Sequence, residues 1–305
     1  MTGPSIPARN SAQNPVWRIT GGRQLTPAPF LIAGIVNITP DSFSDGEEFF
    51  SPESAVRQAQ GLVAQGANLI DLGAESTRPG AKDIGHDIEW QRLEPVLSQV
   101  VRLRDSHSAV PTFAVSIDSF RAETAHKALI MGADIINDVS GGSFDPAMDE
   151  VLAAHKPGYV LGHSPARPDR MQQNPRYNDV MDDLLRWFSA RMNALVKAGL
   201  PEGCICLDPC IGFGKTLEHT LDIIKGLPRF LALGRPLYFG ISRKSYIGAI
   251  TGLPTGGRDT STQVVTALLA KAGVHIHRVH QVAETVATLK LVQRLSPPLA
   301  RSVPL

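Results

Sequence analysis

Short apolar runs rich in β-branched residues alternate with longer segments of helical periodicity along most of the chain. This alternation constrains the fold, because strands separated by helices lie parallel in one sheet. The apolar runs have the length of strands, and the segments between them have the length of helices. Eight runs predict strands, at residues 31–37, 68–72, 113–118, 134–137, 159–163, 204–208, 237–242 and 275–280.

The segments between and after these runs predict eight helices. The clearest covers residues 179–198, where Leu184, Phe188 and Leu195 share one face and Gly199 follows as a stop. The predicted helices lie at residues 53–65, 87–103, 121–131, 146–154, 179–198, 218–231, 262–272 and 282–295. Eight strand–helix pairs without a change in composition predict one closed (β/α)8 barrel, a TIM barrel. A doubly wound open sheet is the alternative, but the early loops lack its Gly-x-Gly-x-x-Gly turn.

The barrel is expected to occupy residues 17–297 as one domain, and it begins with a short hairpin that turns at Gly21-Gly22. Residues 1–16 are rich in Pro, Ser, Asn and Gln, so we expect a disordered tail there, and residues 298–305 form a C-terminal tail. The start of the chain lacks the apolar segment of a secretory signal, and no run of about 18 apolar residues could span a bilayer. We therefore expect a cytoplasmic protein.

Charge and cysteine content exclude several other classes of function. Thirty basic and 29 acidic residues give a net charge of +1, so we expect neither nucleic acid nor a membrane surface as a partner. Cys204, Cys206 and Cys210 have a spacing that could hold a soft metal. The first two lie in an apolar strand-like run, so we interpret them as packing residues. An odd number of cysteines also argues against a disulfide framework.

All eight predicted strands end on polar or charged side chains. Active sites of (β/α)8 barrels are built at the carboxyl ends of the strands, so these side chains are candidates for a site. The strand ends carry Asn37, Asp71 followed by Glu75, Asp118, Asn137 with Asp138, His163, Asp208, Ser242 with Arg243 and Lys244, and Arg278 with His280. Solvated strand ends would explain a few of these residues but not the whole set.

The types of these residues suggest the chemistry of the ligand. Asp118, Asn137 and Asp208 can converge in the mouth, where they suit a flat heterocycle with paired donors and acceptors, such as a pterin or guanine ring. Arg278 and His280 point the same way from the last strand, and together with Lys244 they favour a phosphate group.

Hard oxygen ligands and two further loops complete this interpretation. Asn37 and the nearby Asp45 suit Mg²⁺ that is held largely by substrate phosphates. Arg78 could hold an anionic second substrate, and Ser245 stands at a helix start that favours a carboxylate. Residues 208–215 resemble a phosphate loop only superficially, so we interpret Phe213 as an apolar wall of the pocket.

Three histidines near the end of the chain raise the possibility of a zinc site. His275 and His277 share one face of the predicted strand, whereas Arg278 and His280 share the other. One tetrahedral site made of these histidines is therefore not expected.

Several motifs in order along the chain resemble dihydropteroate synthase of folate biosynthesis. They are IVNITPDSFSDG at 35–46, ESTRPG at 75–80, IND at 136–138, LDP at 207–209 with GFGK at 212–215, SRKS at 242–245 and RVH at 278–280. The resemblance covers residues 17–295. It implies a (β/α)8 barrel, usually a homodimer, that joins 6-hydroxymethyl-7,8-dihydropterin diphosphate to p-aminobenzoate with loss of diphosphate.

The resemblance also implies a role for each matching residue. The pterin ligands would be Asp118, Asn137, Asp208, Phe213 and Lys244. The diphosphate ligands would be Asn37, Thr77, Arg278, Val279 and His280, and the metal ligands for Mg²⁺ would be Asn37 and Asp45. The p-aminobenzoate site, which a sulfonamide would also occupy, would comprise Phe43, Ser76, Thr77, Arg78, Pro79 and Ser245, closed over by the loop 39–46.

The implied reaction needs no nucleophilic side chain. Diphosphate, neutralised by Arg278, His280 and Mg²⁺, would leave the pterin methylene carbon, and the neutral arylamine would then attack. Asp118 and Asp208 would stabilise the intervening cation, so the implied catalytic residues are Asp118, Asp208, Lys244, Arg278 and His280.

The chain departs from the usual family pattern in three places. Gln281 follows His280 where Asp is usual, His163-Ser-Pro replaces His-Met-Gln, and Cys210-Ile211 replaces Gly-Phe. Two alternatives remain open. One is a pterin-binding methyltransferase barrel that serves a cobalamin partner, and the other is a non-catalytic paralogue that only binds pterin.

Overall fold

Eight parallel strands, one from each predicted run, form the centre of the molecule. The computed structural model describes residues 16–27, 29–39, 51–106 and 113–296. The strands are β3 (Leu31–Asn37), β4 (Leu69–Gly73), β5 (Ala114–Asp118), β6 (Ile135–Asp138), β7 (Gly158–Gly162), β8 (Ile205–Asp208), β9 (Tyr238–Gly240) and β10 (Ile276–Val279). Their ends differ from the predicted ends by at most two residues.

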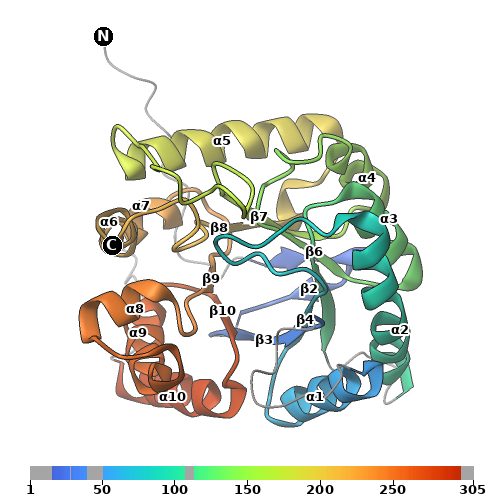
Figure 1. The fold of residues 1–305 in the computed structure, drawn as a ribbon, viewed down its shortest axis with the longest axis horizontal. Helices are drawn as coiled ribbons and strands as arrows, with labels where there is room; N and C mark the ends of the chain where they lie inside the picture. Colours follow the sequence, from blue (N-terminus) through green and yellow to red (C-terminus); the bar gives the residue numbers. More distant parts are fainter. Residues whose placement is uncertain (1–15, 28, 40–50, 107–112, 297–305) are drawn as a thin grey trace, which may run out of the picture.

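The order of the strands closes the sheet into a barrel. Neighbours follow the order β8-β7-β6-β5-β4-β3-β10-β9, and all of these pairs are parallel. A parallel bridge between Leu207 and Leu237 joins β8 to β9 at the remaining seam. Figure 1 shows the strands in the middle and the helices around them. The predicted (β/α)8 barrel is therefore confirmed, and the open-sheet alternative is wrong.

Helices cover the outer face of the barrel. They are α1 (Pro52–Ala64), α2 (Gly85–Ser106), α3 (Ala122–Met131), α4 (Met148–His155), α5 (Val180–Ala198), α6 (Leu217–Lys225), α7 (Leu227–Leu231), α8 (Ser245–Thr251), α9 (Asp259–Lys271) and α10 (Val282–Leu295). Local signals explain their ends. Asp179 accepts a hydrogen bond from the N–H of Asp182 at the start of α5, and Gly199 ends that helix in the left-handed conformation.

The helix predicted at 218–231 differs from the structure, which divides it into α6 and α7. The N–H of Gly226 donates to the carbonyl oxygen of Asp222 and ends α6. Pro228 then stands in the first turn of α7, where its missing N–H leaves no hydrogen bond unmade. The short helix α8 is an additional element, and it begins at the Ser245 position that the sequence indicated.

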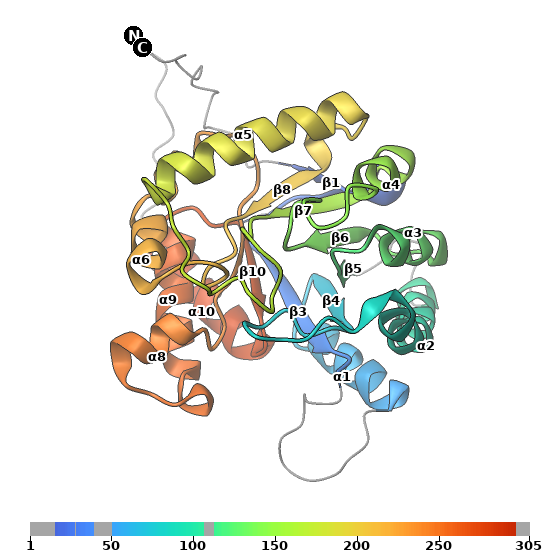
Figure 2. The same ribbon diagram turned by 45° about the horizontal axis from the view of Figure 1, so that its top comes forward.

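The predicted N-terminal hairpin closes the amino end of the barrel. Strands β1 (Trp17–Arg18) and β2 (Gln24–Leu25) pair antiparallel across a turn that includes Gly21 and Gly22, both with positive φ. Trp17 is fully buried, and its indole N–H donates to the carbonyl oxygen of Cys204 at 2.7 Å. The interior cluster at this end comprises Trp17, Ile19, Leu31, Ala33, Leu69, Ala114, Ile135, Val160, Cys206, Tyr238 and Ile276. The hairpin therefore plugs the barrel with apolar side chains. Figure 2 shows β1 close to β8.

The cysteines pack as the sequence predicted. All three are buried and free, and Cys206 belongs to the apolar cluster inside the barrel. No helix in the described part of the chain combines the length and the apolar character needed to cross a membrane. The proposed tail boundaries at 16 and 298 stay predictions, because the tails lie almost wholly outside the described residues.

Candidate active site

On β4, β5, β6 and β10, the inward-facing position changes from apolar to polar two residues further along the strand. Leu69, Ala114, Ile135 and Ile276 belong to the apolar plug, and they are followed inward by Asp71, Ser116, Asn137 and Arg278. These four polar side chains are joined through Asp71, which is fully buried. Its carboxylate accepts hydrogen bonds from Ser116 Oγ at 2.5 Å, Asn137 Nδ2 at 3.1 Å and Arg278 Nε at 2.6 Å.

Arg278 joins Asp71 to Asp118. Its Nη2 donates to Oδ2 of Asp118 at 2.7 Å, so one guanidinium lies between two carboxylates. Burial raises the pKa of Asp118 to about 7; Arg278 opposes this rise and Asp71 adds to it. Two carboxylates that share one cation in a buried site favour uptake of a proton near neutral pH. Asp118 can therefore both donate and accept a hydrogen bond.

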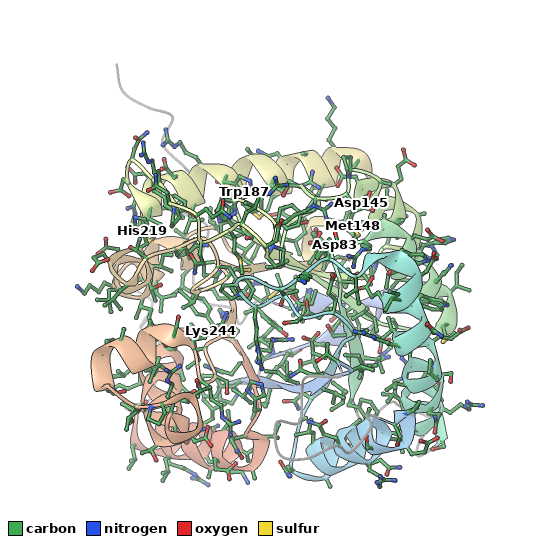
Figure 3. The ribbon with its side chains drawn as sticks, viewed as in Figure 1. Asp83, Asp145, Met148, Trp187, His219 and Lys244 are labelled. Atoms are coloured by element: carbon green, nitrogen blue, oxygen red, sulfur yellow. The ribbon has the colours of Figure 1, made fainter. Side chains whose placement is uncertain are left out.

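Asp208 and Lys244 lie on the other side of the mouth. Burial raises the pKa of Asp208 to about 6, against the hydrogen bond from the N–H of Cys210 at 2.7 Å and the charge of Lys244. Burial also lowers the pKa of Lys244 to about 8. The Nζ atom of Lys244 lies 3.7 Å from the centre of the Phe213 ring, which is a cation–π contact. Lys244 is labelled in Figure 3.

Two strand glycines lie beside the polar side chains of the mouth. A Cβ atom on Gly73 would lie 3.5 Å from Cβ of Asp118, and one on Gly240 would lie 3.6 Å from Cδ of Arg278. Neither glycine has a positive φ, so the backbone does not require glycine there. Glycine at these two positions places no side chain against Asp118 or Arg278.

The candidate diphosphate residues lie on different faces of the barrel wall. His280 Nδ1 lies 2.9 Å from Ser242 Oγ, and burial, with Arg278 next in importance, lowers the pKa of His280 to about 4. Its imidazole is therefore neutral at pH 7 and would act as a hydrogen-bond donor rather than as a cation. Val279 is fully buried against the outer helices, so only its main chain could reach a ligand. Asn37 and Thr77 are half-buried.

The loop between β4 and α2 carries the other candidates for the second substrate. Ser76 and Thr77 are half-buried, whereas Arg78 and Pro79 are exposed. Ser245 is exposed at the first residue of α8. Phe43 and Asp45 lie outside the described residues, so their predicted roles stay predictions.

Comparison with known proteins identifies the family of the chain. A family model described as pterin binding enzyme matches residues 33–280. The chain is 38% identical over 272 residues to a dihydropteroate synthase from Mycobacterium leprae, covering 87% of this chain and 93% of that protein.

The chain belongs to the dihydropteroate synthase family of pterin-binding enzymes.

Solved structures agree with this assignment. A dihydropteroate synthase from Xanthomonas albilineans with 4-aminobenzoic acid superposes with a TM-score of 0.84 at 34% identity, over 93% of this chain and 100% of that chain. The Yersinia pestis dihydropteroate synthase in a sulfonamide complex gives 0.83 at 33% identity, over 90% of this chain and 97% of that chain. Because the chain belongs to this family, the polar mouth between the carboxylates is the candidate pterin site.

Two buried residues of this dihydropteroate synthase fold were not assigned a role from the sequence. Asp71 is the centre of the polar cluster, and a carboxylate inside an otherwise apolar strand was the signal for it. Lys215 is also buried, and its Nζ donates to the carbonyl oxygens of His163 and Phe213, both at 2.9 Å. Lys215 therefore shapes the loop that carries Phe213.

The departure at Cys210 affects the backbone. Cys210 has a φ of 51°, in the left-handed region that favours glycine, which is the usual residue of the family there. Its side chain is buried with Phe120 and Val139, so packing accompanies the strained backbone. Cys210 thus changes the wall of the mouth beside Asp208.

The zinc alternative finds no support in the described residues. His275 Nδ1 accepts a hydrogen bond from the N–H of Leu237, and His277 packs edge-on against Phe30, away from Arg278. No group of three side chains that could hold a metal ion occurs in the described part of the chain.

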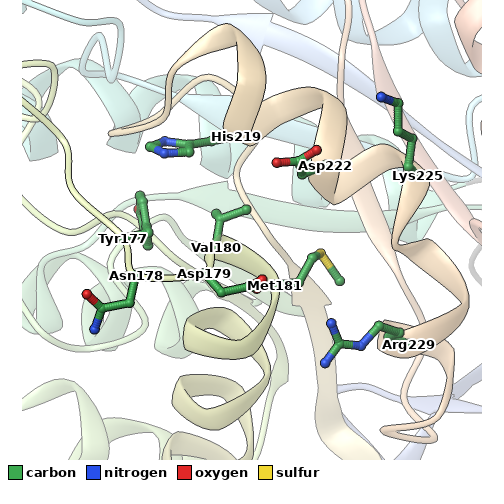
Figure 4. A pocket seen from close by; sticks show the side chains of 9 residues that line it. All are labelled: Tyr177, Asn178, Asp179, Val180, Met181, His219, Asp222, Lys225 and Arg229. Atoms are coloured by element: carbon green, nitrogen blue, oxygen red, sulfur yellow. The ribbon is translucent and has the colours of Figure 1, made fainter.

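One surface cavity in the described part of the chain lies away from the mouth. It has a volume of about 550 Å³ and lies between the start of α5 and helices α6 and α7 (Figure 4). Asp222, Lys225 and Arg229 line it, so its wall is polar and of mixed charge. It contains none of the candidate residues, and we assign the site from the side-chain chemistry of the mouth.

Proposed function

We propose that this protein condenses 6-hydroxymethyl-7,8-dihydropterin diphosphate with p-aminobenzoate to give 7,8-dihydropteroate and diphosphate. The observation that carries the proposal is that Asp118, Asn137 and Asp208 stand at three different strand ends of the same mouth. The activity is the one for which the related enzymes are named.

The pterin ring fits the polar pattern of this mouth. Its aminopyrimidinone presents N–H donors that suit Asp208 and Asp118, and a carbonyl acceptor that suits an amide or ammonium donor. Lys244 and Phe213 form the opposite wall. Burial raises the pKa of Asp208. Hydrogen bonds donated by a bound pterin would lower this pKa again and so favour the ionised carboxylate.

The leaving group would lie beside His280 and Arg278. Two of the guanidinium nitrogens of Arg278, Nε and Nη2, contact Asp71 and Asp118, which directs Nη1 toward a substrate phosphate. His280 would donate from its Nε2 atom because its Nδ1 atom contacts Ser242. As diphosphate leaves, the carboxylates of Asp118 and Asp208 would stabilise the positive charge that develops on the pterin. The arylamine then attacks the methylene carbon and loses a proton.

Mg²⁺ belongs to this proposal through Asn37. The amide oxygen of Asn37 is a hard ligand at the end of β3, and no group of three His, Cys, Asp or Glu side chains in the described chain could hold a metal ion. This donor set fits a metal held mainly by the substrate diphosphate, with Asp45 as a second candidate ligand. When bound, Mg²⁺ would supply charge neutralisation to the leaving diphosphate.

A homodimer and a cytoplasmic location complete the proposal. Two pairs of exposed apolar side chains, Val264 with Leu268 on α9 and Leu291 with Leu295 on α10, lie on helices that pack together. Such a patch suits a second copy of the chain, and Leu268→Glu should then yield a monomer in sedimentation experiments. Free, buried cysteines suit a reducing compartment.

The decisive experiment measures diphosphate release from the dihydropterin diphosphate. Release should depend on added p-aminobenzoate, and 7,8-dihydropteroate should form in equal amount. Release without product, or no release under any condition, would contradict the proposal. A corrinoid spectrum that changes on addition of the protein would instead favour the methyltransferase alternative.

A further inference from the structure

The loop between β4 and α2 is closed by one buried arginine. Arg121 Nη1 donates to Oε2 of Glu75 at 2.5 Å, and Arg121 Nη2 donates to Oδ1 of Asp83 at 2.5 Å. Glu75 and Asp83 are the two ends of a segment that contains Ser76, Thr77 and the exposed Arg78. The same guanidinium therefore holds both ends of this segment, which we name the 76–82 segment.

The environment of Arg121 makes this closure rigid. Its side chain is 11% exposed and that of Glu75 is 5% exposed, so solvent competes little for the pair. The N–H of Ile84 also donates to Glu75, at 2.9 Å, and the guanidinium of Arg121 lies 4.6 Å from the centre of the Phe120 ring. Removing Arg121 would leave the buried carboxylate of Glu75 without its positively charged partner.

A second arginine joins the 76–82 segment to the loop between β7 and α5. Arg167 Nη1 donates to Oδ2 of Asp83 at 3.0 Å, and Arg167 Nη2 donates to the carbonyl oxygen of Phe144, also at 3.0 Å. Its guanidinium lies against the rings of Phe120 and Phe144, at 5.2 and 5.4 Å. In addition, the N–H of Gly80 donates to the carbonyl oxygen of Pro168 at 2.8 Å.

Asp83 is thus shared by two arginines from different loops. Burial acts to raise the pKa of Asp83, but the N–H of Gly85 and the guanidinium of Arg121 lower it overall, so Asp83 is ionised at neutral pH. Asp83 is labelled in Figure 3. An exposed ion pair contributes little to stability by itself. The pair between Asp83 and Arg167 instead fixes the relative position of two loops, because each of the two residues also makes other contacts.

We propose that Arg167 and Asp83 are positioning residues for the arylamine substrate. The inference rests on the proposed function and on the p-aminobenzoate contacts that the family resemblance implies for Ser76, Thr77 and Arg78. By joining the 76–82 segment to the loop after β7, the pair sets where these residues stand over the mouth. The pterin candidates Asp118, Asn137 and Asp208 lie on the strand ends and do not depend on this connection.

The experiment compares Arg167→Ala with Arg170→Ala, a matched control in the same loop. Arg170 is 61% exposed and only approaches Asp169, at 4.0 Å. Arg167→Ala should raise the KM for p-aminobenzoate about two- to fivefold, the effect expected from an exposed ion pair, and leave the KM for the pterin substrate unchanged. Arg170→Ala should behave like the wild type.

A double-mutant cycle tests whether the two residues act together. Arg167→Ala combined with Asp83→Asn should raise the KM by less than the product of the two single effects. If the KM of the double variant rises by the full product of the two single effects, Arg167 and Asp83 act independently and their ion pair does not join the two loops. An equal rise in the KM for both substrates would show general loosening of the fold and would also overturn the proposal.

Hydrogen–deuterium exchange separates this inference from the proposed function. Amides of the 76–82 segment should exchange faster in Arg167→Ala than in the wild type, with no substrate present. Unchanged exchange would overturn the positioning role even in an active enzyme. If the wild-type protein forms no dihydropteroate but Arg167→Ala still exchanges faster than the wild type, the function, and not the connection, was assigned wrongly.

Discussion

At the scale of single residues, burial controls the chemistry of the mouth. Asp118 and Asp208 have raised pKa values, about 7 and about 6, while that of Lys244 is lowered to about 8. All three groups can therefore exchange protons near neutral pH, and their charges respond to a bound ligand. A ligand rich in N–H donors gains most in such a site.

Asp208→Asn tests the pterin pocket at this scale. The amide keeps the shape of the side chain but removes the charge, so a buried donor loses its charge-assisted partner. Hydrogen bonds to charged groups contribute about 1.5–3 kcal/mol, so pterin affinity should fall roughly tenfold or more, measured by calorimetry. Asp222→Asn, the same change in the outer cavity, should leave the affinity unaltered. Equal affinity in Asp208→Asn and wild type would remove Asp208 from the pocket.

The metal proposal also concerns single residues. Activity should disappear in excess chelator and return with added Mg²⁺, because Asn37 and diphosphate supply only hard oxygen ligands. Asn37→Ala should raise the Mg²⁺ concentration needed for half-maximal activity. Full turnover in chelator, or zinc found by elemental analysis of the purified protein, would refute this expectation.

At the scale of elements, the strands hold the pterin candidates Asp118, Asn137 and Asp208, and the described candidates for the arylamine lie in loops or at a helix start. Strand ends are fixed by the ladder of the barrel, whereas loops take their position from side-chain contacts. Gly162 shows how closely the strand ends pack. A Cβ atom there would lie 2.5 Å from the carbonyl oxygen of Asp138 and 2.9 Å from the sulfur of Cys210.

Gly162→Ala should therefore destabilise the protein. Overpacking at such a site costs about 1–3 kcal/mol, because the carbonyl and the strand must shift. Gly61→Ala is the matched control, since nothing lies within 4 Å of its added Cβ atom and it stands inside helix α1. That control should gain about 0.5–1 kcal/mol from helix propensity. Urea unfolding measures both, and equal stability of the two variants would disprove the packing argument.

The division between strands and loops predicts ordered binding. If bound diphosphate and Mg²⁺ against Asn37 position the loop 39–46, p-aminobenzoate should bind more tightly to enzyme that is saturated with pterin and diphosphate. Such coupling typically amounts to about 1–3 kcal/mol and must be reciprocal. Arg78→Ala should weaken p-aminobenzoate or a sulfonamide while leaving pterin binding nearly intact. Equal p-aminobenzoate affinity in free and saturated enzyme would mean that the second site is preformed.

At the scale of the whole molecule, histidines buried in or near the barrel wall link stability to pH. Burial lowers the pKa of His277 to about 3 and that of His275 to about 4. His277 is fully buried, and its ring nitrogens have no hydrogen-bond partner in the described chain. Unfolding returns these side chains to a pKa near 6.5, so the unfolded state binds more protons below that pH.

The stability from neutral His277 should therefore be complete above pH 6.5 and decline as the pH falls toward 3. The free energy of unfolding should fall by about 1.4 kcal/mol per pH unit for such a histidine within that window. His277→Leu should reduce this slope, measured by urea unfolding at several pH values. Phe30→Leu removes the ring packed against His277 and should lower stability equally at each pH. An unchanged slope in His277→Leu would contradict the assignment.

Most of the architecture could be predicted from local patterns. The strand and helix periods, the polar residue at each strand end and the hairpin glycines depend on neighbours in the chain, and the structure confirms them. The division of 218–231 was missed, although Gly226 and Pro228 were present as a signal. The helical pattern of apolar residues over 218–231 outweighed that signal.

The sequence by itself determined that a barrel forms and which end of it carries polar chemistry. Only the tertiary structure decided which of those side chains meet. Arg278 and Asp71 are separated by 207 positions, and they touch because β10 returns to lie beside β3, next to β4. The raised pKa of Asp118 and the lowered pKa of His280 also come from burial in the folded barrel. Asp83 meets Arg121 and Arg167 because the loops that carry them lie together in space. Burial and charge pairing depend on neighbours in space, and strand period alone does not specify them.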